Sequence, residues 1–572
     1  MQNVMGQSVT RDGMAAPVSC EQAAPGGILT PQARIAFWIT IMTAPRALPA
    51  KTDRGRLLAG LLQDGPYDLA IVGGGATGLG VALDAASRGL SVALVESLDF
   101  AKGTSSRATK LAHGGVRYLA QGNIALVREA LRERRAILRN APHLAAPLSF
   151  VVPGYRCWEA PFYTVGLKLY EALAGRARIG GAKLLSPEET LHCLPGVRSQ
   201  GLKGAARYWD GQFDDARLAL ALARTAAGFG AALLNYCSAE RLLYENGRAA
   251  GLQCRDAETG ESFAIRARCV VNATGVWTDE LRRQDSRQRG QTAGDLVMPS
   301  QGVHLVVDAS FLDSQSALLV PRTRDGRVLF AVPWLGKLVL GTTDTPRMDI
   351  AREPVAGRDE VEFILNEAGR YLSRAPARSD VTSVWAGLRP LVVPGGKHDE
   401  GGTSHVNREH TVLVSASGLV SVAGGKWTTY RAMAQDVLAR CEAAGLLPSL
   451  PPCRTENLML VGGEARRAAA SLAGARAYDV YGSEEEAVRA LPGADAELCA
   501  GVTEAMLRFA ARHEYARTVE DALARRCRTL FLDAAMAASI APRAARIMRE
   551  ETGVDSRLEE FLALAEQYAN AP

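Results

Sequence analysis

The sequence predicts an α/β protein in which a parallel sheet is interleaved with an antiparallel sheet and followed by a helical C-terminal part. Three observations predict this fold class. From Tyr67 to Glu96 two short apolar runs flank a helical pattern, which is the order of a βαβ unit. From Met298 to Thr343 short β-rich runs alternate with turns such as Asp325-Gly326 and Gly336-Lys337. After Pro451-Pro452 the pattern is helical and rich in Ala, Arg and Glu.

The first βαβ unit carries a glycine-rich turn. The buried run Asp68 to Val72 leads into Gly73, Gly75 and Gly78, and a helical pattern follows from Thr77 to Arg88. The first glycine allows a tight turn, the second lets a pyrophosphate approach the backbone, and the third lets helix and strand pack closely. The helix N-terminus offers N–H groups and the positive end of the helix dipole. The turn therefore predicts a Rossmann-like, dinucleotide-binding sheet.

A second buried run, Ser91 to Val95, ends on Glu96. This carboxylate lies about 20 residues past the glycines, where an acid can hydrogen-bond a ribose hydroxyl. The pattern alone does not separate NAD from FAD.

Small polar residues follow this acid. Thr104, Ser105 and Ser106 come after Gly103, and they are either a plain polar loop or hydroxyls that close over a diphosphate. The run His113-Gly114-Gly115 brings the backbone close to a flat or bulky group, and Arg117 and Tyr118 follow at once.

Length and composition exclude some classes of function. A chain of 572 residues is expected to form more than one domain. The net charge of +5 is modest, and no basic run is interleaved with aromatics, so a nucleic-acid partner has no support. The ten cysteines include no C-x-x-C pair and are expected to be reduced, with no metal site. No apolar run approaches the ~20 residues of a membrane-spanning helix.

Residues 1–66 precede the first strand. They are expected to be a disordered extension, read either as a targeting arm that is poor in acids or as residues upstream of a true start at Met42. We favour the second interpretation, because Asp53 to Leu62 suffices as a short lead-in helix.

At this point the chain resembles a known family. The stretch from Ile71 to Glu96, followed by GTSSRATKLAHGGVRYL, resembles the FAD-dependent, quinone-linked glycerol-3-phosphate dehydrogenases. The resemblance continues in YWDGQFDDARLALA (Tyr208 to Ala221), VVNATGVW (Val270 to Trp277), GVHLVVD (Gly302 to Asp308), LVLGTTD (Leu338 to Asp344), GLRPL (Gly387 to Leu391) and VAGGKWTTYR (Val422 to Arg431). It implies FAD as cofactor and a fold of the glutathione-reductase/D-amino-acid-oxidase type.

The resemblance also implies a division of the chain. The FAD-binding domain is expected in residues 67–150, 205–297 and 385–440, the substrate domain in 151–204 and 298–384, and a helical cap in 450–572. In the cap, HEYARTVEDALARRCRTLFLD (His513 to Asp533) is similar to the family, and its alternating Arg and Glu are expected to form a solvated face.

Cofactor contacts are implied where small residues end a strand or begin a helix. The turn Asn272 to Gly275 follows a buried strand, and Gly424-Gly425-Lys426 lies between a strand and a helix. The implied set is Gly73, Gly75, Ala76, Gly78, Glu96, Thr104, Ser105, Ser106, His113, Gly114, Asn272, Ala273, Thr274, Gly275, Gly424, Gly425, Lys426, Thr428 and Thr429.

Two residues are implied to be catalytic. His304 is the candidate base, because a neutral imidazole can accept a proton near pH 7. Pro390 favours an extended backbone conformation at Arg389. Arg389 is the candidate that stabilises negative charge on the substrate C2 oxygen. The phosphate of glycerol 3-phosphate would be clamped by Arg117, Tyr118, Arg408 and Lys426. Gln301 stands where some relatives have lysine, which weakens the case for a catalytic cation beside Gly302.

Several alternatives stay open. The acceptor is expected to be a membrane quinone, with peripheral contact at the cytoplasmic face of the inner membrane, and a homodimer is compatible with the sequence. The alternatives are an oxidase that uses oxygen, an amine or amino-acid oxidase of the same superfamily, and a non-catalytic FAD-binding scaffold. No EF-hand loop appears, so calcium regulation is not expected, and the pattern is typical of bacterial-type members.

Overall fold

The computed structural model describes residues 52–62, 65–116, 119, 122–393, 409–464, 468–474 and 477–572. The expectations for residues 1–51 and for Arg117, Tyr118 and Arg408 lie outside these ranges. The lead-in helix is present as α2 (Arg54–Leu61), and its N-cap Asp53 accepts a hydrogen bond from the Arg56 N–H.

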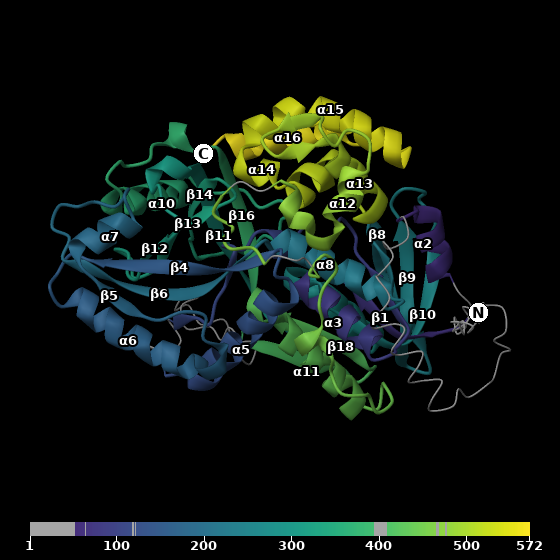
Figure 1. Ribbon diagram of the computed structural model, residues 1–572. Helices are drawn as coiled ribbons and strands as arrows, with labels where there is room; N and C mark the ends of the chain where they lie inside the picture. Colours follow the sequence, from purple (N-terminus) through teal and green to yellow (C-terminus); the bar gives the residue numbers. More distant parts are fainter. Residues whose placement is uncertain are drawn as a thin grey trace, which may run out of the picture. The chain divides into compact units, whose positions relative to one another are not determined.

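A parallel sheet forms around the first predicted strand. Its order is β18 (Leu419–Gly424), β10 (Ser262–Asn272), β1 (Tyr67–Val72), β2 (Val92–Val95) and β7 (Ala232–Leu234), and β17 (His410–Val414) pairs antiparallel with β18. The helices α3 (Ala76–Ser87), α8 (Asp215–Gly228) and α11 (Tyr430–Ala443) cover one face (Figure 1). The antiparallel strands β8 (Cys237–Glu245) and β9 (Arg248–Asp256) cover the other face. This layering is that of a Rossmann-like dinucleotide domain.

Alternating side chains explain why both faces are buried. Leu69 and Ile71 contact the helices, whereas Ala70 and Val72 pack toward β8 and β9. Both sets are at most 8% exposed, as expected for a strand in the middle of a covered parallel sheet.

The second sheet is mainly antiparallel, as predicted. Its order is β15 (Thr345–Pro346), β11 (Val297–Asp308), β14 (Lys337–Gly341), β13 (Leu329–Trp334), β12 (Ala317–Val320), β4 (Ala145–Gly154), β6 (Gly204–Phe213) and β3 (Leu111–Ala112); β16 (Ser383–Val392) pairs with β11, and β5 (Lys183–Leu185) with β6. Leu335 and Gly336, both with positive φ, make the tight turn between β13 and β14. Around this sheet lie α5 (Ile124–Asn140), α6 (Glu159–Ala174), α7 (Pro187–Cys193) and α10 (Arg358–Tyr371).

The expected division of the chain needs correction at four strands. All of β3, most of β6, most of β16 and the greater part of β4 fall in segments assigned to the FAD-binding domain, but all four strands belong to the antiparallel sheet. A short apolar run gives no sign of which sheet it will join, because the partner strand is remote in sequence.

The C-terminal part is mostly helical. It contains α12 (Glu485–Arg489), α13 (Glu504–His513), a π-helix (Asp521–Arg526), α14 (Thr529–Leu532), α15 (Ala534–Thr552) and α16 (Leu558–Ala569), with a small hairpin of β19 (Glu497–Cys499) and β20 (Val502–Thr503). Leu530 and Phe531 pack on the same face of the antiparallel sheet as Trp334 and Trp385. The expectation of a solvated Arg and Glu face is wrong for Arg525, Arg526 and Arg528, which are at most 2% exposed.

Candidate active site

A cavity of about 930 Å³ lies where the two sheets meet. Its wall includes the carboxyl ends of β1, β2 and β10, represented by Gly73, Glu96 and Ala273. Residues of the antiparallel sheet, including His304 and Arg389, line it as well. The carboxyl edge of a parallel sheet is where such folds bind dinucleotides. The volume is at the upper end of the ~300–1,000 Å³ that is usual for small-molecule sites.

The glycine-rich turn has the shape that a pyrophosphate requires. Gly73 has φ +110°, and a Cβ there would lie 2.5 Å from the Ala273 carbonyl oxygen. A Cβ on Gly78 would lie 1.9 Å from the Gly73 carbonyl oxygen, so this glycine sets the packing of α3 on β1 and does not line the cavity. Ser105 Oγ accepts a hydrogen bond from the Ala76 N–H at 2.9 Å, which brings the hydroxyl loop onto the start of α3.

Glu96 is held in place by the backbone. Its Oε2 accepts from the Gly74 N–H at 2.7 Å and its Oε1 from the Leu98 N–H at 2.9 Å. Burial raises the pKa of Glu96 above its ordinary value, against the lowering effect of these N–H groups. The carboxylate lines the cavity at the end of β2, so it fits the predicted contact with a ribose.

Asn272 shapes the turn after β10 from within. Its Nδ2 donates to the Thr278 carbonyl oxygen at 2.8 Å, and its Oδ1 accepts from Thr274 Oγ1 at 2.7 Å. Ala273, Thr274 and Gly275 line the cavity, whereas Asn272 is fully buried behind them.

The glycine pair Gly424-Gly425 also brings the backbone close to the cavity. Gly424 and Gly425 have φ of +76° and +79°, and both line the cavity with Lys426 and Thr428. A 3₁₀ turn, Trp427–Thr429, comes between these glycines and α11, so the helix begins at Tyr430. Trp427 Nε1 donates to the Ser105 carbonyl oxygen at 2.8 Å, which joins this segment to the hydroxyl loop.

His304 projects from β11 toward the cavity. Its Nε2 lies 2.9 Å from Thr109 Oγ1, and its ring stacks on Trp385 with centroids 4.1 Å apart. Burial, with the cations Arg389 and Lys110 nearby, holds the pKa of His304 well below its ordinary value. The imidazole is therefore neutral near pH 7, as a general base must be.

A buried cation lies behind this stack. Lys110 Nζ is 4.7 Å from the centroid of the Trp385 ring, which is the ring on which His304 stacks. The same Nζ lies 2.9 Å from Asp215 Oδ2. Arg528 from the C-terminal part pairs with the other oxygen of Asp215 at 2.9 Å. Burial lowers the pKa of Lys110 to about 7, because Asp215 only partly offsets the loss of water and the repulsion from Arg528.

Arg389 is fixed on β16 beside Gly302. Its Nη1 lies 3.2 Å from Asp344 Oδ1, and its Nη2 donates to Thr342 Oγ1 at 3.1 Å. A Cβ on Gly302 would lie 2.2 Å from Arg389 Nη2, so only glycine leaves room for this guanidinium. Gln301 points the other way and donates to Glu360 Oε2 at 2.6 Å, away from the cavity lining.

The structure brings most predicted site residues together. Those that line the cavity are Gly73, Gly75, Ala76, Glu96, Thr104, Ser105, His113, Ala273, Thr274, Gly275, His304, Arg389, Gly424, Gly425, Lys426 and Thr428. Gly78, Ser106, Gly114, Asn272 and Thr429 are not part of the lining. They lie next to it because each is a chain neighbour of a lining residue, and they shape or support the wall.

Sequence reasoning missed several lining residues. Lys102, Thr109 and Trp277 lie within motifs that were recognised, but nothing in the motifs singled them out. Ile350 and Arg352 come from the segment between β15 and α10, which carries no recognisable pattern.

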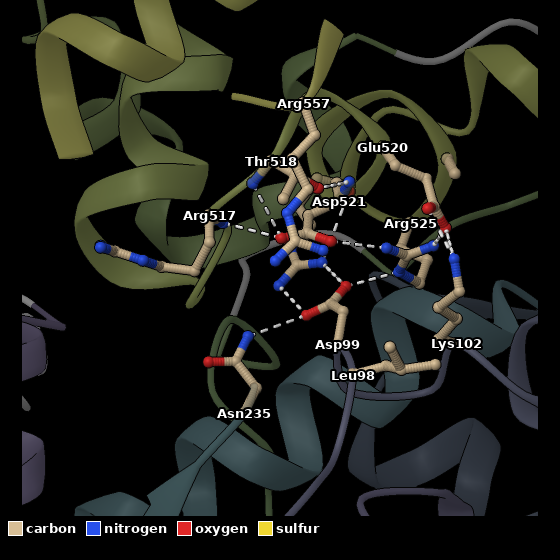
Figure 2. A network of polar contacts seen from close by, with 12 residues as sticks. Leu98, Asp99, Lys102, Asn235, Arg517, Thr518, Glu520, Asp521, Arg525 and Arg557 are labelled. Carbon is tan, nitrogen blue, oxygen red and sulfur yellow. Dashed lines mark hydrogen bonds and ion pairs between the residues drawn. The ribbon is translucent and has the colours of Figure 1, made fainter. Parts of the chain in front are cut away.

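The C-terminal part is tied to the loop after Glu96 by a set of charges, here called the interdomain cluster. It consists of the buried Asp99, Arg525 and Arg526 and the partly exposed Lys102 and Glu520. Figure 2 shows Asp99 between Asn235 and Arg525. Asp99 accepts from Arg525 Nε at 2.5 Å and from Arg526 Nη2 at 2.9 Å. Glu520 accepts from Lys102 at 2.5 Å and from Arg525 at 2.6 Å. The π-helix, which adds a residue per turn, carries Arg525 and Arg526.

Fold and site together define a dinucleotide-binding protein of the oxidoreductase type. A family profile described as FAD dependent oxidoreductase matches residues 68–431, and one described as C-terminal domain of alpha-glycerophosphate oxidase matches residues 453–558. The chain is 40% identical over 539 residues to "Glycerol-3-phosphate dehydrogenase, mitochondrial" of Bos taurus, covering 88% of this chain and 73% of that protein. It is 36% identical to the Schizosaccharomyces pombe protein of the same name, covering 91% and 89%.

A solved structure agrees with these relatives. The glycerol-3-phosphate dehydrogenase from Bacillus halodurans, complexed with FAD, superposes with a TM-score of 0.71 at 29% identity and covers 91% of this chain and 98% of that one. The chain belongs to the family of FAD-dependent glycerol-3-phosphate dehydrogenases.

Proposed function

We propose that the protein oxidises sn-glycerol 3-phosphate to dihydroxyacetone phosphate and passes the electrons to a membrane quinone. The observation that carries the proposal is the composition of the cavity. A dinucleotide cradle at one side is continuous with His304, Arg389 and Lys426 at the other. The names of the relatives give the substrate.

The residues present fit FAD. Gly73 and Gly75 leave room for a pyrophosphate, the start of α3 offers N–H groups, and Glu96 is placed for a ribose. When bound, FAD supplies the two-electron acceptor, through its N5, for the hydrogen that leaves substrate C2.

The cations of the site select and orient the substrate. Lys426 lines the cavity at the Gly-Gly turn, where it can bind the phosphate. Arg117, Tyr118 and Arg408 are proposed to complete this phosphate clamp. Arg389 is held by Asp344 and Thr342, so its guanidinium is already oriented when charge develops on the C2 oxygen.

His304 removes the proton of the C2 hydroxyl. Its Nε2 edge already contacts a hydroxyl, that of Thr109, and both residues line the cavity. Because its ring is stacked on Trp385, the imidazole cannot turn away from that position without losing the contact. The neutral form expected near pH 7 can accept the proton.

The experiment is a comparison of substrates and acceptors with the purified holoenzyme. We expect sn-glycerol 3-phosphate to reduce a quinone analogue, while glycerol and sarcosine do not. Activity with sarcosine would instead support an amine oxidase. Peroxide formation that persists when the quinone analogue is present would support an oxidase. The cytoplasmic face of the inner membrane is the proposed location, where quinone is within reach.

A further inference from the structure

The imidazole of His304 is held at one edge and at one face. Its Nε2 lies 2.9 Å from Thr109 Oγ1, and its face stacks on Trp385. In the described part of the chain, no group is hydrogen-bonded to the other ring nitrogen, Nδ1. The stack alone would also accept the ring turned over, because the torsion that rotates an imidazole has two similar minima. The Thr109 hydroxyl therefore decides which edge of the ring faces the cavity.

Thr109 lies in a segment, Ser106–Lys110, that is folded around the buried carboxylate of Asp215. The Ala108 N–H donates to Asp215 Oδ2 at 2.9 Å. Lys110 Nζ donates to the same oxygen at 2.9 Å and to the Ser106 carbonyl oxygen at 2.8 Å. The backbone of Lys110 is left-handed, with φ +66°, which a side chain other than glycine rarely adopts. Because both neighbours of Thr109 are bonded to Asp215, the place of the Thr109 hydroxyl depends on this carboxylate.

Arg528, from the C-terminal part, bonds to the same two acceptors as Lys110. Its Nη2 donates to Asp215 Oδ1 at 2.9 Å and to the Ser106 carbonyl oxygen at 3.1 Å. Its side chain is 1% exposed, and its backbone is also left-handed, with φ +67°. A residue is kept in this conformation only where the surrounding contacts fix it. Burial lowers the pKa of Lys110 to about 7, so this ammonium loses its charge near neutral pH, whereas a guanidinium does not.

The helix that follows Arg528 supports the other contact of His304. Phe531 on α14 packs edge to face on Trp385, with ring centroids 5.3 Å apart. Figure 1 shows α14 beside β16, and Ser383 Oγ at the start of β16 donates to the Leu530 carbonyl oxygen at 2.9 Å. Both contacts that hold His304 therefore lead back to the same short piece of the C-terminal part.

We propose that Arg528 is a positioning residue, which holds Ser106–Lys110 on Asp215 and so directs the Thr109 hydroxyl onto His304. Arg528 is not part of the cavity lining and acts only through these neighbours. The C-terminal part is thus a working component of the active site, although Arg528 lies 422 residues beyond Ser106. The inference rests on the proposed role of His304 as the base.

The test is anaerobic reduction of the flavin by sn-glycerol 3-phosphate over a range of substrate concentrations. Thr109→Val removes the hydroxyl and Thr109→Ser keeps it. We expect Thr109→Val and Arg528→Met each to lower the limiting rate about ten- to a hundredfold, with little change in the substrate concentration for half-maximal rate, because they misplace the base and leave the phosphate contacts alone. Thr109→Ser should keep most of the rate. Arg528→Lys, the milder change, should fall between Arg528→Met and the wild type.

Arg224→Met is the matched control. Arg224 on α8 is 4% exposed and pairs with Glu484 of the C-terminal part at 2.6 Å, so this variant also removes a buried cation between the same two parts of the protein. It should lower stability and leave the limiting rate unchanged. Equal slowing in Arg224→Met and Arg528→Met would mean that docking of the C-terminal part sets the rate, and would overturn the proposal.

A double variant tests the route from Arg528 to the base. If Arg528 acts through Thr109, adding Arg528→Met to Thr109→Val should slow flavin reduction no further than Thr109→Val alone. Slowing by the product of the two single effects overturns the proposal. So does a wild-type rate in either Thr109→Val or Arg528→Met.

Hydrogen exchange of the holoenzyme tests the hold on Ser106–Lys110 without turnover. In Arg528→Met the peptide that contains Ala108 should exchange on the order of tenfold faster, because the bond of its N–H to the carboxylate opens more often. In Arg224→Met it should exchange like the wild type. Unchanged exchange in Arg528→Met overturns the proposal. A wild-type flavin that sn-glycerol 3-phosphate does not reduce would count against the proposed function, and the exchange would then decide this proposal by itself.

Discussion

The interdomain cluster and the charges around His304 are both mostly shielded from solvent, but they are built differently. In the interdomain cluster each carboxylate meets two cations: Asp99 contacts Arg525 and Arg526, and Glu520 contacts Lys102 and Arg525. Around the cavity, Lys110 and Arg389 each have a carboxylate partner, but both also act on the neutral His304. In the interdomain cluster the charges neutralise one another. Around the cavity, the charges of Lys110 and Arg389 also lower the pKa of His304 in the cavity wall.

The pKa directions support this distinction. Burial would raise the pKa of Asp99, but Arg526 and Arg525 outweigh it and keep the pKa below the ordinary value. Arg525 and Lys102 likewise hold the pKa of Glu520 at about 2. An acid whose pKa is lowered by folding stabilises the fold above its unfolded pKa, and this contribution is lost as pH falls toward 2. For His304, burial and the cations Arg389 and Lys110 all lower the pKa and so disfavour its protonated form.

The largest effect is expected from Asp99→Asn. The change leaves Arg525 and Arg526 buried beside a neutral amide, which typically costs about 3–5 kcal/mol of unfolding free energy. Chemical denaturation of the holoenzyme measures it. Arg266→Gln, at a pair whose side chains are 68% and 58% exposed, is the control and should cost less than about 1 kcal/mol. Equal losses of unfolding free energy in the two variants would show that the interdomain cluster stabilises the fold no more than an exposed ion pair does.

Arg389→Met should reduce kcat on the order of 10²–10³-fold, as removal of a preorganised donor to a developing oxyanion does. Methionine keeps much of the volume, and loss of the pair with Asp344, whose side chains are 25% and 16% exposed, should cost less stability than Asp99→Asn does. Single-turnover flavin reduction measures the step directly. An unchanged rate at saturating substrate would remove Arg389 from the proposed mechanism.

Lys110→Met should change the pH dependence of kcat/KM. His304 acts as base when neutral, so activity is present above its pKa and is lost as pH falls through it. Removing the cation behind Trp385 raises that pKa, and the acid limb of the profile should move to higher pH. Lys110→Arg, which keeps the charge, is the control. A limb that stays in place in Lys110→Met would mean that the cation does not influence His304.

The smallest effect is expected from Glu96→Gln. The amide can still hydrogen-bond a ribose, but it loses the charge-assisted part of the bond, so FAD should bind on the order of tenfold more weakly. Fluorescence of flavin released on dilution measures the affinity. Ser97→Ala, which removes only the 3.2 Å hydrogen bond from Ser97 Oγ to Glu96 Oε1, is the comparison and should weaken FAD binding less. An equal loss there would mean that the orientation of the Glu96 side chain, and not its charge, supports FAD binding.

The sequence predicted the parts of the molecule that local patterns determine. The turn at Gly73, the acid at Glu96 and the turn after Asn272 each follow a buried strand, so their position at one sheet edge could be inferred. The buried partners could not be inferred. Asp99 and Arg526 are 427 residues apart, and nothing near either residue specifies the other. Runs of Arg and Glu predict a solvated face on an isolated helix, and only the packed domain shows that Arg525 and Arg526 are inside.

The most direct test of the central claim is anaerobic mixing of the FAD-loaded enzyme with sn-glycerol 3-phosphate. If His304 and Arg389 face a substrate held against the flavin, the yellow absorbance should bleach within a single turnover, and the pH at which bleaching slows should follow the state of His304. Flavin that stays oxidised with this substrate, in an enzyme that holds FAD tightly, would contradict the account.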